Sequence, residues 1–133
     1  MKQIGKVGFT CSVFDLLHAG HVLMLEEARS QCDYLIVGLQ TESREGKDKP
    51  IQSVVERYLQ LKACKYVDEI IPYTTEEDLQ DILSSVDIDI RILGSEYKGK
   101  DYTGSYICKK RGIEIYFNER EHRFSSTYLR DRL

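Results

Sequence analysis

Lys6 to Leu25 read KVGFTCSVFDLLHAGHVLML, and within this stretch a strand-like pattern gives way to a helical one. The first half is a β-rich apolar run, which breaks near Gly20 into the spacing of an amphipathic helix. This junction places His18 and His21, together with backbone N–H groups, at one helix N-terminus. Histidines three residues apart in a first turn lean to the same side, and the positive end of the helix dipole adds to their field. The stretch therefore predicts a phosphate-binding site where a strand meets a helix.

The two histidines stand out in this chain. It contains only three histidines, and two of them share one four-residue turn with a glycine between them. A lone histidine near an apolar run is usually a structural residue, whereas this spacing favours a functional pair. We therefore interpret His18 and His21 as phosphate ligands.

Phe14 to His21, FDLLHAGH, resembles the signature of the cytidylyltransferase-like nucleotidyltransferases, and most of the chain resembles the glycerol-3-phosphate cytidylyltransferases among them. The similarity continues through Cys32 to Val37, Arg57, Tyr66 to Pro72, Gly94 to Lys100 and Phe124 to Thr127. The resemblance implies transfer of the cytidylyl group of CTP to glycerol 3-phosphate or a related phosphorylated alcohol. The acceptor phosphate attacks the α-phosphorus in line, which gives CDP-glycerol and pyrophosphate. Such an enzyme would serve the synthesis of teichoic acid or of a capsule.

The resemblance also implies which residues act. The catalytic side chains, which align the triphosphate and stabilise the transition state, are His18, His21, Arg120, Lys47 and Lys49. The nucleotide is expected to contact Val13, Phe14, His18, Gly20, His21, Gly94, Glu96, Arg120, Ser125, Ser126 and Thr127. The acceptor is expected to contact Asp15, Arg57 and Lys65. A guanidinium suits bidentate binding of phosphate oxygens, and hydroxyls at the start of a last helix suit the β- and γ-phosphates.

Three departures from the family pattern leave the acceptor open. Ser12 stands where the family has a glycine before the Phe-Asp pair, and Lys65 stands where it has an arginine. His122 and Arg123 add bulk and charge before the terminal serines. One alternative is an adenylyltransferase or cytidylyltransferase of the same superfamily that acts on another phosphorylated acceptor. The other is a non-catalytic nucleotide-binding module.

Gly94 to Lys100 also fit GxxxxGK, the first seven positions of a P-loop. The eighth position is Asp101, which lacks the hydroxyl that holds Mg²⁺ in a P-loop, and the stretch follows the fourth predicted strand rather than the first. We therefore reject a P-loop. Mg²⁺ is expected to arrive with CTP, because no Asp/Glu cluster stands out as a metal site of the protein itself. The resemblance further implies a homodimer, with Tyr66 to Pro72 near the interface.

The alternation of strand and helix patterns predicts one domain over residues 1–133. Its fold class is α/β, a Rossmann-like, doubly wound, five-stranded parallel sheet with helices on both faces. Strands are predicted at 2–11, 34–39, 69–72, 88–93 and 113–117, and helices at 20–31, 53–64, 75–86, 105–110 and 125–130. The polar segment 40–52 is predicted to be a mobile loop. Ligands of such folds bind beyond the carboxyl ends of the strands, where the polar loops lie.

Composition narrows the class of partner. The net charge of −3 and the pI of about 5.6 argue against a broad nucleic-acid surface, because duplex binding needs a basic face. No apolar run approaches the ~20 residues of a membrane span, and the N-terminus has no secretory signal pattern. The four cysteines lie far apart without CxxC spacing, which is typical of reduced thiols. We expect a cytoplasmic protein whose partners are small anionic molecules.

Overall fold

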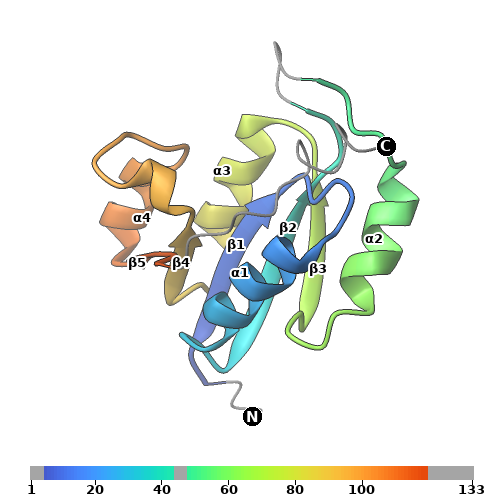
Figure 1. Ribbon diagram of the computed structural model, residues 1–133. Helices are drawn as coiled ribbons and strands as arrows, with labels where there is room; N and C mark the ends of the chain where they lie inside the picture. Colours follow the sequence, from blue (N-terminus) through green and yellow to red (C-terminus); the bar gives the residue numbers. More distant parts are fainter. Residues whose placement is uncertain (1–4, 44–47, 120–133) are drawn as a thin grey trace.

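The computed structural model describes residues 5–43 and 48–119. Its elements in chain order are β1 (Val7–Ser12), α1 (Ala19–Arg29), β2 (Tyr34–Gln40), α2 (Val54–Lys62), β3 (Glu69–Tyr73), α3 (Glu76–Ser85), β4 (Ile90–Leu93), the 3₁₀ turn η1 (Ser95–Tyr97), α4 (Ser105–Arg111) and β5 (Glu114–Phe117). The five strands form one sheet in the order β3-β2-β1-β4-β5, and every neighbouring pair is parallel (Figure 1). The predicted doubly wound α/β fold is confirmed.

Helices cover both faces of the sheet, and each face buries its own apolar cluster. The cluster under α1 and α2 consists of Phe14, Leu25, Ala28, Cys32, Leu35, Val37, Leu39, Leu61, Ile90 and Ile92. The cluster under α3 and α4 consists of Phe9, Ile36, Tyr73, Leu79, Ile82, Leu83, Ile88, Cys108 and Ile113. Because both faces are covered, β2 is apolar along nearly its whole length, as its continuous sequence pattern predicted.

Two helices begin at capping boxes, at Ser53 and at Thr75. The Ser53 hydroxyl accepts a hydrogen bond from the Glu56 N–H at 3.2 Å, and the Glu56 carboxylate accepts one from the Ser53 N–H at 2.9 Å. Thr75 and Asp78 form the same reciprocal pair at the start of α3. These local hydrogen bonds use N–H groups that have no partner inside the helix, and they fix where each helix starts.

Several boundaries differ from the predicted ones. Among the described residues β1 begins at Val7, and α1 ends at Arg29 with Ser30 as its C-cap, two residues before the predicted end. The fourth strand begins at Ile90 instead of residue 88, and just before it the Asp89 carboxylate accepts the Val7 N–H at 2.8 Å. The predicted helix at 125–130 lies outside the described residues.

Strand β3 forms one edge of the sheet and contains Pro72. The Tyr73 carbonyl accepts a hydrogen bond from the Thr41 N–H at 2.8 Å, so the backbone groups of Tyr73 face β2. Successive residues of a strand direct these groups to opposite sides, and the nitrogen of Pro72 therefore faces away from the sheet.

Within the described part of the chain, no helix has the length and apolar character needed to cross a membrane.

Candidate active site

The histidine pair lies where β1 leads into α1, at the carboxyl edge of the sheet. His18 is the N-cap of α1, and its Nδ1 accepts a hydrogen bond from the Gly20 N–H at 3.0 Å. The Nδ1 atom of His21 accepts one in return from the His18 N–H at 3.3 Å. The two rings lie 4.0 Å apart between centroids, with an interplanar angle of 31°. The pair is thus a capping box in which imidazoles replace the usual hydroxyl and carboxylate.

This geometry assigns the ring protons. A nitrogen that accepts a hydrogen bond carries no proton, so in the neutral imidazoles of His18 and His21 the proton resides on Nε2. Each neutral ring therefore carries its N–H donor at Nε2. The Nε2 atom of His18 is buried, whereas His21 lines the large cleft described below. Two such donors at the positive end of a helix dipole form a place where phosphate oxygens are favoured.

The turn before the pair is strained and strongly held. Phe14 and Leu16 both have φ of +53°, a conformation that side chains other than glycine rarely adopt. The Asp15 carboxylate accepts the N–H groups of Ile51 at 2.8 Å and Gln52 at 3.0 Å. The Gln52 side-chain oxygen in turn accepts the Leu16 N–H at 2.9 Å. The chain just before α2 therefore holds the turn in the conformation that presents the histidines.

Arg57, in the first turn of α2, completes this arrangement. Its side chain is 2% exposed, and its guanidinium donates to the carbonyls of Val13, Gln40, Thr41 and Gln52 at 2.7–3.2 Å. Burial lowers the pKa of Arg57, and the nearby Asp15 charge opposes that effect. The sequence resemblance implied that Asp15 and Arg57 contact the acceptor. In the structure their side chains hydrogen-bond the backbone that shapes the β1–α1 turn, and Asp15 also lines the large cleft described below. Their contacts with an acceptor stay predictions.

One large cleft of about 1150 Å³ lies along the carboxyl ends of the strands, where the fold predicts ligands. It is lined by the end of β1, the start of α1, α3, the end of β4 and the segment that leads into α4. Its volume exceeds the roughly 300–1000 Å³ of a typical pocket for one small ligand. The cleft therefore has room for a nucleotide together with a small second substrate.

The cleft brings together several residues that were predicted to bind nucleotide. Val13, Phe14 and His21 line it beside α1, and Gly94 and Glu96 line it after β4. The Phe14 and His21 rings pack with centroids 5.6 Å apart. A Cβ added to Gly94 would lie 2.1 Å from a Glu96 carboxylate oxygen, so the end of the Glu96 side chain lies directly against this glycine. Ser12, the departure from the family glycine, also lines the cleft.

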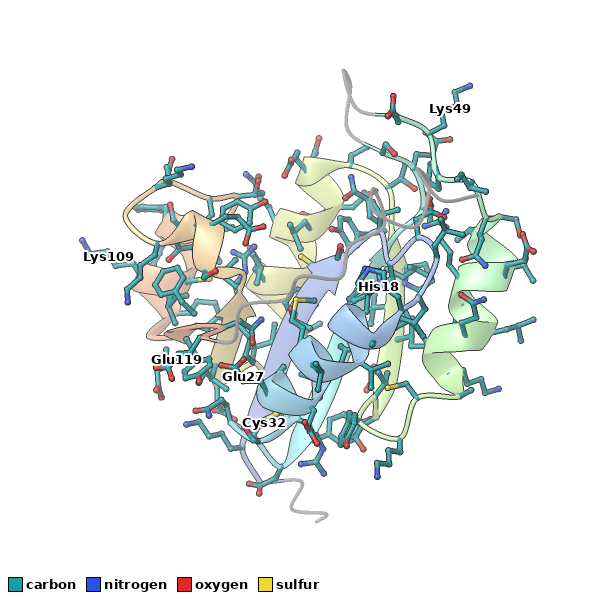
Figure 2. All side chains as sticks on the ribbon, viewed as in Figure 1. His18, Glu27, Cys32, Lys49, Lys109 and Glu119 are labelled. Atoms are coloured by element: carbon teal, nitrogen blue, oxygen red, sulfur yellow. The ribbon has the colours of Figure 1, made fainter. Side chains whose placement is uncertain are left out.

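Other predicted residues are not gathered at the cleft. Lys65 is exposed before the start of β3, at the amino edge of the sheet and thus opposite the histidines, with its ammonium 5.3 Å from the centroid of the Tyr66 ring. The Lys49 side chain is exposed and reaches away from the sheet, apart from His18 (Figure 2). His18 and Gly20 lie at the start of α1 and are not among the residues that line the cleft. The other predicted residues lie outside the described ranges: Lys47, Arg120, Ser125, Ser126 and Thr127.

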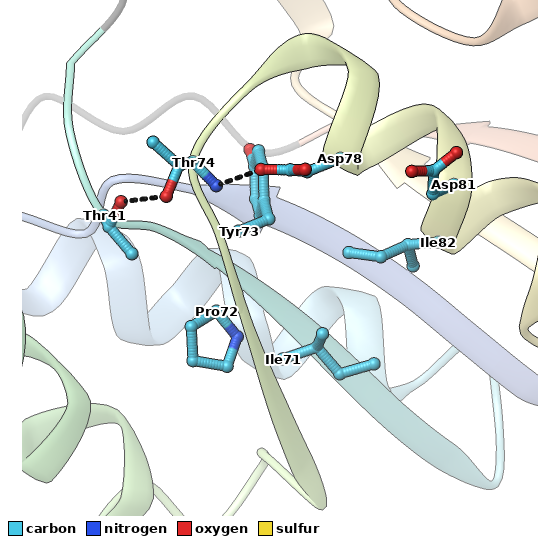
Figure 3. Close-up of a pocket in the computed structure, with 8 residues that line it drawn as sticks. All are labelled: Thr41, Ile71, Pro72, Tyr73, Thr74, Asp78, Asp81 and Ile82. Atoms are coloured by element: carbon cyan, nitrogen blue, oxygen red, sulfur yellow. Dashed lines mark hydrogen bonds between the residues drawn. The ribbon is translucent and has the colours of Figure 1, made fainter.

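A second cavity of about 390 Å³ lies between β3 and the start of α3 (Figure 3). Its polar groups bond to one another. The hydroxyls of Thr41 and Thr74 lie 2.8 Å apart, and the Asp78 carboxylate accepts the Thr74 N–H at 3.1 Å. These contacts cap α3 and join the ends of two strands, so the large cleft is the candidate site.

Sequence reasoning missed three residues that shape the site. Gln52 and Glu27 act through partners far away in the sequence, and no local motif marks them. Arg91, on β4, lines the cleft although its side chain is 2% exposed. The available signal was a single charge between two isoleucines in a strand that is otherwise buried. Within the described ranges, no group of three or more His, Cys, Asp or Glu side chains is arranged to hold a metal ion.

Comparisons with known proteins agree with this geometry. The profile of the cytidylyltransferase-like family matches residues 9–132. The bifunctional protein HldE of Hyphomonas neptunium is 35% identical over 114 residues, which cover 83% of this chain and 23% of that protein. HldE of Caulobacter vibrioides is 32% identical over 128 residues, which cover 93% of this chain and 26% of that protein. The chain thus spans about a quarter of the length of these curated relatives.

A solved structure shares the fold. The lipopolysaccharide core biosynthesis protein from Thermoplasma volcanium superposes with a TM-score of 0.74 and 24% identity, covering 89% of this chain and 99% of that chain. At this level of identity the likeness concerns the arrangement of strands and helices.

Proposed function

This chain belongs to the cytidylyltransferase-like family, and on that premise we propose that it transfers a nucleotidyl group from a nucleoside triphosphate to a small phosphorylated acceptor. An acceptor phosphate oxygen forms a bond to the α-phosphorus, and the bond between this phosphorus and the oxygen that bridges to the β-phosphorus breaks. Pyrophosphate leaves with the electron pair, and the product carries a new diphosphate linkage. No protein nucleophile takes part in this step.

The observation that carries the proposal is the histidine pair. His18 and His21 stack 4.0 Å apart at the N-terminus of α1, and His21 lines the cleft. Their Nε2–H groups are suited to donate to the triphosphate oxygens, on which negative charge grows during the attack and departure of phosphate groups. Donors held in place beforehand stabilise that charge without reorganisation, and they align the α-phosphorus for in-line attack.

Mg²⁺ belongs to this proposal as the counter-ion of the triphosphate, and when bound it neutralises phosphate charge. The carboxylates that line the cleft come from separate elements or loops: Asp15, Asp48, Glu76, Glu96 and Asp101. This dispersal fits an ion that enters with the nucleotide and keeps several waters, as Mg²⁺ commonly does.

The identity of the acceptor is a finer proposal. The resemblance to glycerol-3-phosphate cytidylyltransferases supports CTP and glycerol 3-phosphate. The relatives named above are bifunctional HldE proteins, and their names do not refer to glycerol 3-phosphate as a substrate. They favour the wider proposal, in which the nucleotide is CTP or ATP and the acceptor is a phosphorylated sugar or alcohol.

The experiment is an assay of pyrophosphate release by the purified full chain with Mg²⁺. CTP and ATP are each paired with glycerol 3-phosphate, glucose 1-phosphate and a panel of other sugar phosphates. Release that requires both a nucleotide and one acceptor supports the proposal, and the productive pair names the substrates. Binding of nucleotide without release with any acceptor would favour the non-catalytic module.

A further inference from the structure

Arg91 is a buried cation in the middle of β4. It lies between Ile90 and Ile92, and its side chain is 2% exposed. The two isoleucines pack into the cluster under α1 and α2. Side chains alternate along a strand, so Arg91 points to the opposite face, which α3 and α4 cover.

The contacts of Arg91 leave part of its guanidinium without a hydrogen-bond acceptor. Its Nη1 donates to the Thr103 carbonyl and lies 3.9 Å from the Cys108 sulfur, and its Cζ lies 5.2 Å from the centroid of the Tyr102 ring. Its buried Nε has no hydrogen-bond partner. Across residues 5–43 and 48–119, no carboxylate forms an ion pair with it.

Glu76 is the carboxylate whose charge acts, together with that of Arg91, on Cys11 and Tyr73. It accepts the Thr103 hydroxyl, and among the described residues it forms no ion pair with Arg91. Burial raises the pKa of the Cys11 thiol, although the charge of Arg91 opposes this effect. Burial likewise raises the pKa of the Tyr73 and Tyr102 hydroxyls. These groups are therefore neutral at physiological pH. A buried cation with no carboxylate paired to it is unfavourable, and a ligand anion bound to it would reduce that cost.

Arg91 and His21 line the same cleft from opposite faces of the sheet. Gly104 helps to form the wall beside Arg91: it has φ of +80°, and a Cβ there would lie 2.3 Å from Leu83 and 3.5 Å from the Arg91 Nη1. Glycine thus lets the Thr103 carbonyl approach the guanidinium. The guanidinium is held from one side and faces the cleft on the other.

We propose that Arg91 binds the phosphate of the acceptor, on the side of the cleft opposite to His18 and His21. This inference rests on the proposed function, in which a phosphate monoester attacks the nucleotide. A planar guanidinium binds two oxygens of one phosphate in parallel, which lysine does not do. Arg91 on one face and the imidazole donors on the other then hold the two anionic substrates, which would otherwise repel each other, until the attacking oxygen is in line.

The test measures binding independently of turnover. Glycerol 3-phosphate, glucose 1-phosphate and inorganic phosphate are titrated into the full chain by calorimetry. Each titration is run with and without a CTP analogue in which a methylene replaces the α,β-bridging oxygen. We expect Arg91→Gln to raise the Kd of the bound phosphates at least tenfold and to leave the Kd of the analogue within twofold. Arg111→Gln removes the same charge from α4, outside the cleft lining, and is expected to change neither value.

Each outcome bears on the inference. If the wild-type chain binds none of the three phosphates, or if Arg91→Gln binds them equally well, Arg91 is not the acceptor ligand. Weaker binding of the analogue alone would place Arg91 with the nucleotide and overturn the inference. If circular dichroism shows that Arg91→Gln does not fold, Arg91→Lys is tested in its place, because lysine keeps the positive charge but lacks the planar guanidinium. We expect Arg91→Lys to bind the phosphates at least fivefold more weakly, and unchanged affinity would contradict the inference. Phosphate binding that depends on Arg91 without pyrophosphate release would instead refute only the proposed function.

Discussion

The carboxylate of Glu27 on α1 accepts a hydrogen bond from the backbone N–H of Glu119 at 2.7 Å (Figure 2). The same carboxylate accepts the Tyr116 hydroxyl at 2.8 Å, and the Glu27 side chain is 6% exposed. Glu119 directly precedes Arg120 in the sequence. Helix α1, whose first turn carries the histidines, is thus bound to the chain that leads to the predicted phosphate-binding residues at the C-terminus.

Replacing Glu27 by Ala should weaken this attachment. The Glu119 N–H and the Tyr116 hydroxyl, whose hydrogen bonds are partly buried, lose a charged acceptor, which costs about 1–3 kcal/mol of unfolding free energy. We also expect weaker nucleotide binding, measured as a higher KM for the triphosphate. Glu26→Ala is the matched control: the Glu26 carboxylate accepts the Tyr66 hydroxyl at 2.9 Å, so this variant removes a comparable bond on the same helix. An equal rise in KM for both variants would contradict a specific role of Glu27.

Variants that keep the helix cap separate the two roles of the histidines. His18→Asn retains a side-chain acceptor at the N-cap, and His21→Gln retains a side chain that can accept the backbone N–H of the N-cap residue. Both remove the Nε2–H donor. We expect stability to change by less than about 1 kcal/mol, while turnover falls by a factor of about 100 or more. Near-normal turnover of the folded His18→Asn protein would remove that histidine from the catalytic machinery.

Arg57→Lys tests whether Arg57 builds the site or contacts the acceptor. An ammonium group cannot satisfy four carbonyls in the geometry of a guanidinium, so unpaired buried acceptors should lower the unfolding free energy by about 2 kcal/mol or more. We expect kcat and both KM values to worsen together, because the turn that carries the histidines loosens. A variant of normal stability with a raised KM for the acceptor alone would instead support the contact implied by the sequence resemblance.

The N-terminus of α3 should make stability depend on pH. Hydrogen bonds from the Thr75 and Thr74 N–H groups lower the pKa of Asp78 below its ordinary value of 3.8. The ionised carboxylate therefore stabilises the fold above pH 3.8, and this contribution is lost as the pH falls below that value. Thermal unfolding of the wild type and of Asp78→Asn, followed from pH 7 downward, should show a difference in Tm that shrinks under acid. A difference that stays constant would show that the charge contributes nothing.

Removal of divalent cations should stop the reaction and leave the fold intact. With a chelator present, we expect pyrophosphate release to fall to background, because the triphosphate loses its counter-ion. The Tm of the protein without nucleotide should not change, since the proposal gives Mg²⁺ no site in the protein alone. A lower Tm under chelation would reveal a resident metal ion, and activity that persists would remove the metal from the proposal.

The parts of the structure that were predicted correctly depend on local patterns. Capping boxes at Ser53 and Thr75 mark helix starts because their partners lie three residues away. The histidine pair lies within one turn, so its position could be predicted from the sequence for the same reason. Uninterrupted apolar runs likewise identify central parallel strands, since both faces of such strands are covered.

The remaining features depend on contacts between distant segments. Arg57 and its acceptor Val13 are 44 positions apart, and Asp15 bonds to residues 36 and 37 positions away, so neither arrangement leaves a local pattern. Arg91 looks like the polar position of a half-exposed strand until α4 and the segment before it cover that face. The catalytic lysines, the C-terminal ligands and the homodimer stay predictions.

The proline on the edge strand has a consequence for association between molecules. Exposed strand edges invite another chain to extend the sheet, and natural proteins often block them with proline. The nitrogen of Pro72 faces outward and carries no hydrogen, so β3 lacks a donor near the carboxyl end of its outer edge. This gap disfavours a continuous intermolecular sheet at β3 and protects the fold against aggregation there. A second copy that docks on this side would have to meet β3 through side-chain packing.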